Sequence, residues 1–138
     1  MSTDVYRELI LEHYKHPRNY GKMKDPDVII YESNPLCGDE IEIHLKMDKG
    51  FVKDLKFSGR GCAISQASAS LLTDRFKGKP AEEIMRMKNE EVLHILGLDV
   101  RKLNPARTQC AVLPLKAIKS AIGKYQEKIK AEAGRHQN

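Results

Sequence analysis

The feature that most constrains the fold is a strict alternation of polar and apolar residues over Glu40–Met47. A period of two places every second side chain on the same face of a β-strand, so this segment is predicted to be a half-buried strand. Turn-forming residues follow at Asp48–Gly50, and the alternation resumes at Phe51, Leu55 and Phe57. Together these patterns predict an antiparallel β-hairpin, which commits this part of the chain to a sheet with one buried face.

The rest of the chain is predicted to form one further strand and several helices. The β-branched run Val28–Tyr31 suits a strand before the hairpin, and Asp4–Tyr14 has the apolar spacing of a short amphipathic helix. Four more helices are expected: from near Ile64 to Gly78, after Pro80, from Asn89 to near Gly97, and along Ile118–Ile129. No strand–helix–strand alternation is present, so the predicted fold class is α+β, a three-stranded antiparallel sheet packed by four to six helices.

Length and composition exclude several classes of protein. The 138 residues suit one compact domain over 1–138, and no apolar run approaches the roughly 20 residues of a membrane span. The N-terminus lacks the basic and apolar regions of a signal peptide, so a cytoplasmic protein is expected. The net charge of +5 is spread along the chain and only 6% of the residues are aromatic, which argues against a nucleic-acid partner.

Three cysteines, Cys37, Cys62 and Cys110, could fill the core, bind a metal or react. An odd number at sparse spacing in a cytoplasmic chain argues against a disulfide framework. The Asp48–Gly50 turn lies midway between Cys37 and Cys62, so a regular hairpin would place these two thiols opposite each other. Asp39 follows Cys37 by two residues and would point to the same side of a regular strand.

The backbone beside two of the cysteines is expected to bend, because glycines flank them at Gly38, Gly59 and Gly61. A bulge at these glycines would shift the strand pairing by one residue. Cys62 is also predicted to lie at the N-terminus of the helix that begins near Ile64. Helix N-termini present unpaired N–H groups and a positive dipole end, which stabilise a thiolate.

Cys110 is expected on the loop just before the C-terminal helix. Proline is best accommodated in a first helical turn, so Pro114 predicts that the regular helix begins near Leu113. The three thiols and the Asp39 carboxylate would then form a four-ligand set at strand ends and helix starts. Such ligands suit Zn²⁺ or iron–sulfur chemistry and are too soft for Mg²⁺ or Ca²⁺.

Two other cysteine chemistries fit the sequence less well. A thiol–disulfide oxidoreductase would carry C-x-x-C, which the sequence lacks. A nucleophile at Cys62, with Ser65 or Arg60 stabilising an oxyanion, would need a histidine base, and no histidine is well placed to serve as one. The five histidines also form no metal-binding motif, so each is expected to be exposed or structural.

Four parts of the chain resemble one known family. They are His13–Asn19 (H-Y-K-H-P-R-N), Asn34–Asp39 (N-P-L-C-G-D), Gly61–Ser70 (G-C-A-I-S-Q-A-S-A-S) and the region of Cys110. They resemble the signatures of the iron–sulfur cluster assembly scaffold proteins, namely IscU, SufU and the N-terminal domain of NifU. The resemblance covers nearly the whole chain and implies an IscU/NifU-N-terminal-like (SufE/NifU-type) fold in a single scaffold domain, 1–138.

The resemblance also implies a function. The protein would be a scaffold rather than an enzyme: it would receive sulfur as persulfide from a cysteine desulfurase of the IscS or SufS type and bind iron. It would build a labile [2Fe–2S] cluster and pass the cluster to apo iron–sulfur proteins. By this resemblance Cys37, Cys62 and Cys110 ligate the cluster, and Asp39 is the fourth ligand or controls release. Each of the three cysteines is a candidate sulfur acceptor, and a homodimer is left open.

The third cysteine motif departs from the IscU pattern, in which Leu-Pro-Pro-Val-Lys is followed after one residue by His-Cys. Asn104 interrupts the double proline, and Gln109 replaces the histidine. Recognition by a Hsp70-type chaperone through this motif is therefore not predicted.

Arg107, three residues before Cys110, resembles instead the SufU pattern, whose members bind Zn²⁺ and accept sulfur from their desulfurase. The 47 residues between Cys62 and Cys110 are nevertheless few for the insertion typical of SufU. A zinc-binding sulfur acceptor with sulfurtransferase-like activity is therefore the alternative to a cluster scaffold. In either case Arg107, Gly38 and Gly61 are expected to lie beside the ligands.

Overall fold

The chain forms three strands and five helices within the residues that the computed structural model describes, 3–36, 38–99 and 101–136. In chain order these elements are α1 (Thr3–Lys15), β1 (Val28–Asn34), β2 (Asp39–Asp48), β3 (Phe51–Arg60), α2 (Ala63–Phe76), α3 (Ala81–Arg86), α4 (Asn89–Ile95) and α5 (Pro105–His136). The strands form one antiparallel sheet in the order β1-β2-β3. The predicted α+β class and three-stranded sheet are confirmed.

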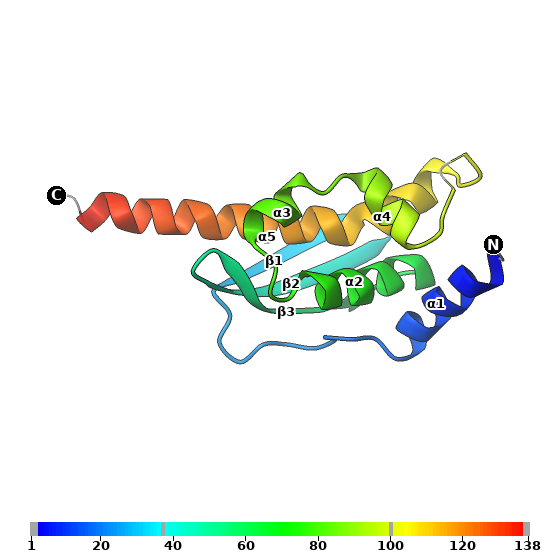
Figure 1. The fold of residues 1–138 in the computed structure, drawn as a ribbon, viewed down its shortest axis with the longest axis horizontal. Coiled ribbons are helices and arrows are strands. Elements are labelled where there is room, and N and C mark those ends of the chain that lie inside the picture. The colour runs from blue at the N-terminus through cyan, green and yellow to red at the C-terminus, as the bar shows by residue number, and fades with distance from the viewer. Residues whose placement is uncertain (1–2, 37, 100, 137–138) are drawn as a thin grey trace.

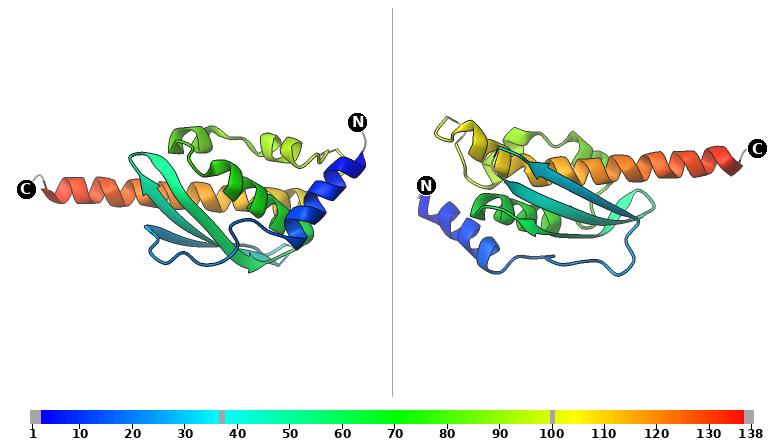
Figure 2. Two further views of the ribbon diagram at one scale, coloured as in Figure 1. Left: turned by 60° about the horizontal axis from the view of Figure 1, so that its bottom comes forward. Right: turned by 180° about the vertical axis from the view of Figure 1, so that it is seen from behind.

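Two helices cover one face of this sheet (Figure 1; Figure 2). Helices α2 and α5 pack against the strands and against each other, α1 packs on α2, and α3 and α4 pack on α5. The apolar positions of the alternating pattern, among them Ile41, Ile43 and Leu45 of β2, are buried beneath these helices. Each buried side chain of this size contributes about 1.5–3 kcal/mol. This core fixes the ends of the strands relative to the starts of α2 and α5.

The β2-β3 hairpin has its irregularity next to the turn. The register shifts between Lys46 and Met47, and not at the glycines of the opposite end where the sequence predicts bending. Between Glu40 and Lys46 the pairing of β2 with β3 is regular, and Glu40 lies opposite Arg60. Gly59 has a φ of +142°, and a Cβ there would collide with the carbonyl oxygen of Glu40. The far end of the hairpin therefore needs a glycine for close strand approach but no inserted residue.

The outer edge of β3 is covered by the segment that follows α1. The N–H of Gly21 donates to the carbonyl of Phe57 at 2.8 Å, and the N–H of Phe57 donates to the carbonyl of Asn19 at 3.0 Å. Tyr20 and Phe57 form a short parallel bridge, and their rings meet edge to face with centroids 5.3 Å apart. The segment thus pairs with β3 on the side opposite β2.

Helix α5 begins earlier than the sequence predicts. It starts at Pro105, and the side-chain oxygen of Asn104 caps it by accepting a hydrogen bond from the N–H of Arg107 at 2.8 Å. Pro114 lies inside the helix, so the prediction that Cys110 precedes the helix is wrong. An interior proline costs about 3 kcal/mol. The residues on both sides of Pro114 are buried, and this burial offsets the lost hydrogen bond.

The second half of α5 extends beyond the sheet (Figure 1). The helix has 32 residues, which corresponds to about 48 Å at the usual rise. All residues after Ile122 with described side chains are exposed or partly exposed. None of the helices in the described ranges combines the length and the apolar character needed to cross a membrane.

Candidate metal centre

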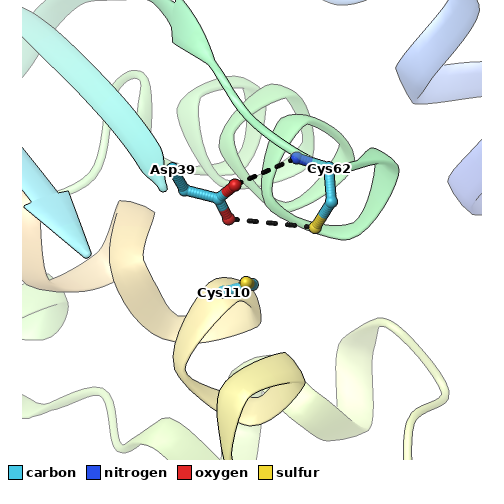
Figure 3. A group of neighbouring side chains, drawn as sticks. All are labelled: Asp39, Cys62 and Cys110. Carbon is cyan, nitrogen blue, oxygen red and sulfur yellow. Dashed lines mark hydrogen bonds between the residues drawn. The ribbon is translucent and has the colours of Figure 1, made fainter. Parts of the chain in front are cut away.

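Three of the four predicted ligands converge at one end of the core (Figure 3). Asp39 is the first residue of β2, Cys62 precedes α2, and Cys110 lies on the second turn of α5. One carboxylate oxygen and the two sulfurs all lie within 4.8 Å of one another. Asp39 and Cys110 are each 3% exposed, whereas Cys62 is exposed, so the centre is accessible from the side of Cys62. Cys37 lies outside the described residues.

The start of α2 holds the carboxylate of Asp39 in place. The N–H of Cys62 donates to Asp39 Oδ1 at 3.1 Å, and Cys62 Sγ lies 3.8 Å from Asp39 Oδ2 (Figure 3). Cys62 is the N-cap residue of α2, which confirms its predicted position at a helix N-terminus. The positive end of the helix dipole favours both a carboxylate and a thiolate at this point.

Small buried residues bring α2 and α5 close enough for their cysteines to meet. Ser68 Oγ donates to the carbonyl of Ala111 at 2.7 Å, and both residues are fully buried. Short side chains at a helix contact reduce the distance between the two axes. Because Ala111 directly follows Cys110, this contact sets Cys110 beside the start of α2.

Gly61 provides space in the centre. A Cβ at this position would collide with Ser65 Oγ and would lie 2.9 Å from Asp39 Oδ1. Gly61 does not have a positive φ, unlike Gly38 with a φ of +74°. Gly61 lies beside the ligands, as expected. The sequence carries no signal for this contact, because it depends on how Ser65 turns in the first turn of α2.

Arg107 lies one turn before Cys110, and its side chain is exposed. It lines a cavity of about 440 Å³ that is formed largely by apolar residues of α1, α2 and the α4–α5 connection. Arg7 lies on the same cavity wall, and Ile64, two residues after Cys62, also contributes to it. The three described ligands do not line this cavity, so Arg107 approaches the centre only through its position on α5, one turn before Cys110.

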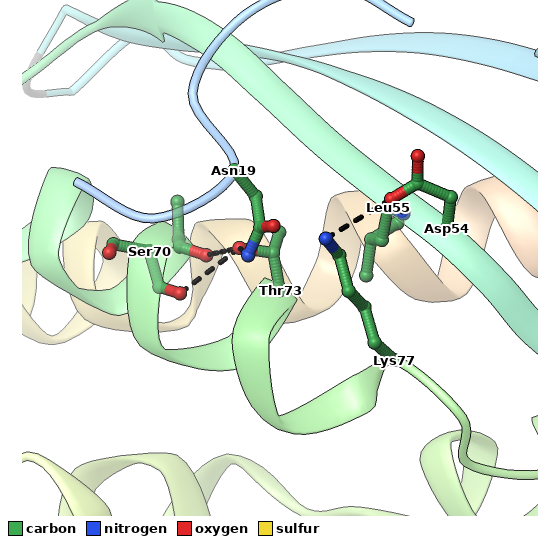
Figure 4. Close-up of polar contacts among 7 residues, drawn as sticks. Asn19, Asp54, Leu55, Ser70, Thr73 and Lys77 are labelled. Atoms are coloured by element: carbon green, nitrogen blue, oxygen red, sulfur yellow. Dashed lines mark hydrogen bonds and ion pairs between the residues drawn. The ribbon is translucent and has the colours of Figure 1, made fainter.

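Residues of the His13–Asn19 motif bond α1 and the segment after it to the middle of α2. His13 Nδ1 and Ser70 Oγ are hydrogen-bonded at 2.7 Å, and the N–H of Arg18 donates to the same oxygen at 2.8 Å. Asn19 Nδ2 donates to Thr73 Oγ1 at 3.1 Å (Figure 4). Burial lowers the pKa of His13 below its usual range, and the charge of Arg18 lowers it further. His13 is therefore a structural histidine, as predicted.

The fold and the centre define a class of small α+β proteins in which a strand end and two helices bring thiols and a carboxylate together. Residues 5–132 match the family described as NifU-like N terminal domain, and the chain belongs to this family.

Curated relatives in this family carry two kinds of name. The chain is 40% identical over 133 residues to the iron-sulfur cluster assembly scaffold protein IscU of Thermotoga maritima, a match that covers 87% of this chain and 94% of the relative. It is 38% identical over 137 residues to the zinc-dependent sulfurtransferase SufU of Bacillus subtilis, which covers 88% and 92% respectively.

The fold is also found in a solved structure, the nitrogen-fixing NifU-like protein (N-terminal) from Brucella abortus. The two structures agree with a TM-score of 0.75 at 25% sequence identity, over 91% of this chain and 96% of that chain. The family and fold implied by the sequence resemblance are thereby confirmed.

Proposed function

We propose that the protein is a scaffold for iron–sulfur cluster assembly, with Asp39, Cys62, Cys110 and Cys37 as the ligands. The observation that carries this proposal is the convergence of two sulfurs and one carboxylate oxygen within 4.8 Å from three separate elements. Membership of a family in which relatives are named as IscU scaffolds supports it. In this role the cluster is cargo, built on the protein and then passed to apo iron–sulfur proteins.

The donor set suits the metals of this chemistry. Ligands at about 2.0–2.3 Å from a tetrahedral ion lie about 3.3–3.8 Å from one another. The ligand atoms of this centre lie up to 4.8 Å apart, so small side-chain rotations would bring them to these distances. Thiolates select iron–sulfur clusters and zinc, whereas Mg²⁺ and Ca²⁺ take oxygen ligands.

Cys37 enters the proposal through its distance along the chain. It precedes Asp39 by two residues, and two residues span at most about 7 Å. The N–H of Gly38 donates to the carbonyl of Asn34 at 2.8 Å, so the chain turns between β1 and β2. The assignment of Cys37 as a ligand therefore rests on its position two residues before Asp39 in the sequence.

The uneven exposure of the ligands suits a cargo that is delivered and then released. Cys62 is the exposed ligand of the described set, so we propose that its thiolate attacks the outer sulfur of the desulfurase persulfide. The sulfur–sulfur bond of the donor breaks, the outer sulfur stays on Cys62, and the desulfurase cysteine leaves as a thiolate. Cys110 and Cys37 are the other candidate acceptors.

The Asp39 carboxylate is a harder and more exchangeable ligand than a thiolate, which favours release of the cluster.

A second function, zinc-dependent sulfur transfer, is favoured by the relative named as the SufU sulfurtransferase. In this role the same residues would hold Zn²⁺, and the protein would accept sulfur from the desulfurase without building a cluster. The same residues are proposed as ligands in both functions, so an experiment has to separate them.

The experiment is anaerobic reconstitution with ferrous iron, cysteine and a cysteine desulfurase, followed by visible absorption and metal analysis. A scaffold is expected to develop a cluster chromophore that is lost in Cys37→Ser, Cys62→Ser and Cys110→Ser variants and that transfers to an apo iron–sulfur protein. Stoichiometric zinc that persists, with stimulation of the desulfurase and no chromophore, would refute the scaffold and support the zinc-dependent function.

The Asp39→Ala variant tests the proposed release step in the same assay. Its cluster is expected to persist longer than that of the wild-type protein, because the most exchangeable ligand is gone. Asp25→Ala is the matched control, since the side chain of Asp25 is 91% exposed. Faster loss of the cluster from Asp39→Ala would contradict the proposed role of the carboxylate.

A further inference from the structure

We propose that Ser65 is a positioning residue whose hydroxyl donates a hydrogen bond to the sulfur of Cys62 when that sulfur binds metal. The inference rests on the proposed function only in that Cys62 serves as a ligand. It assigns Ser65 a task in tuning the metal–sulfur bond, in addition to its place in α2.

The hydroxyl of Ser65 lies between two atoms of Cys62. Ser65 is 5% exposed and lies in the first turn of α2. Its hydroxyl donates to the carbonyl of Cys62 at 3.1 Å, and Cys62 Sγ donates to Ser65 Oγ at 3.9 Å. The oxygen is therefore already beside the sulfur.

Loss of the thiol proton reverses the direction of this contact. A metal-bound sulfur accepts hydrogen bonds, and a bond to a charged acceptor is stronger than one between neutral groups. The carbonyl of Cys62 also accepts a hydrogen bond from the N–H of Gln66 at 3.1 Å. The hydroxyl can therefore turn from the carbonyl to the sulfur without leaving the carbonyl unpaired.

The packing around Ser65 keeps the hydroxyl at this position. A Cβ at Gly61 would collide with Ser65 Oγ, so a side chain there would push the hydroxyl away from Cys62. A hydroxyl bonded to a carbonyl in a first helical turn is by itself a common structural feature. What points to the sulfur is the burial of Ser65, its distance from Sγ and the second partner of the carbonyl.

The test uses Co²⁺ as a spectroscopic probe of the sulfur ligands in the metal-free protein. In Ser65→Ala the sulfur-to-cobalt charge-transfer band is expected to move to lower energy, because the sulfur loses a stabilising hydrogen bond. Groups that bond to metal ligands typically change affinity by at least about tenfold, so Co²⁺ is expected to bind about tenfold more weakly. Ser65→Thr keeps the hydroxyl and is expected to restore both values.

Ser70→Ala is the structural control, since Ser70 is a buried serine of the same helix that bonds to α1. It is expected to lower the melting temperature and leave the cobalt band unchanged. The inference would be overturned if Ser65→Ala had the same charge-transfer band and the same Co²⁺ affinity as the wild-type protein. It would also be overturned if the wild-type protein with bound Co²⁺ showed no sulfur-to-cobalt charge-transfer band. The cobalt assay does not require a cluster. If the protein fails to build a cluster in the reconstitution experiment, the scaffold function is refuted, but a shifted cobalt band would still support the role of Ser65.

Discussion

At Gly61, the carboxylate of Asp39 and the hydroxyl of Ser65 both lie against the backbone, and a methyl group has no room there. Gly61→Ala is therefore expected to displace both side chains. Overpacking of this kind typically lowers the free energy of unfolding by about 1–3 kcal/mol. Chemical denaturation measures this loss, and Co²⁺ titration of the same variant is expected to show weaker binding.

Gly123→Ala is the matched control, because a Cβ on this glycine of α5 would have no atom within 4 Å. Alanine is favoured over glycine inside a helix by up to about 1 kcal/mol, so this variant is expected to be as stable as the wild-type protein or more stable. Equal destabilisation by both substitutions would contradict the packing explanation for Gly61.

The residue types in the centre were predictable from the sequence, but their contacts were not. Asp39, Cys62 and Cys110 stand out because few side chains bind soft metals, and the structure brings all three together. Ser65 does not stand out in this way, because α2 also carries buried Ser68 and Ser70. Only the side-chain geometry shows which of these hydroxyls lies beside the sulfur.

Among the elements, α5 shows how two sequence signals can compete. Asn104 followed by Pro105 has the chemistry of an N-cap and a first helical position, and the structure places the helix start there. Pro114 suggests a later start, and the prediction gave it too much weight. Propensity describes a helix in isolation, whereas the burial of the residues around Pro114 comes from the tertiary fold.

The docking of α1 on α2 is expected to depend on pH through His13. Because burial lowers the pKa of His13 in the folded protein, the fold favours the neutral imidazole. Above the ordinary value of 6.5 this contribution to stability is fully present. As the pH falls from there toward the folded-state pKa, the unfolded chain takes up a proton that the folded chain does not, and stability is lost.

The measurement is the free energy of unfolding of the wild-type protein and of His13→Gln between pH 7.5 and about pH 5. The variant is expected to lose less stability over this range than the wild-type protein. His16→Gln is the control, since His16 is exposed near the end of the same helical segment. Identical pH profiles for the wild-type protein and His13→Gln would contradict this role of His13.

For the molecule as a whole, a metal in the centre would join segments that are far apart in the sequence. Cys62 follows Asp39 by 23 residues, and Cys110 lies on the last helix. A ligand that binds only the folded state stabilises it by about 2.7 kcal/mol at one hundred times its Kd. Removal of bound metal with a chelator is therefore expected to lower the melting temperature.

The Cys62→Ser variant provides the control for this measurement, because it lacks one ligand and is expected to respond less to the chelator. The melting temperature can be followed by circular dichroism, with Zn²⁺ added back to restore the original value. No change on chelation of a protein shown to contain metal would refute the coupling between the centre and the fold.

The arrangement of the whole chain was predictable where neighbouring residues determine it. The hairpin follows from the alternation in Glu40–Met47 and the turn after it, and β2 and β3 form as predicted. The position of Cys110 beside Cys62 depends instead on the contact between Ser68 of α2 and Ala111 of α5. No local pattern encodes such a long-range contact, so its geometry became visible only in the structure.

The pairing of residues 19–21 with β3 also affects how the protein meets other copies of itself. An edge strand with unpaired N–H and C=O groups is a template onto which a strand from another chain can add, and such addition starts aggregation. Here Asn19 and Gly21 already bond to Phe57 on that edge, and the ring of Tyr20 packs on the same residue. An incoming strand would have to displace this segment before it could extend the sheet beyond β3.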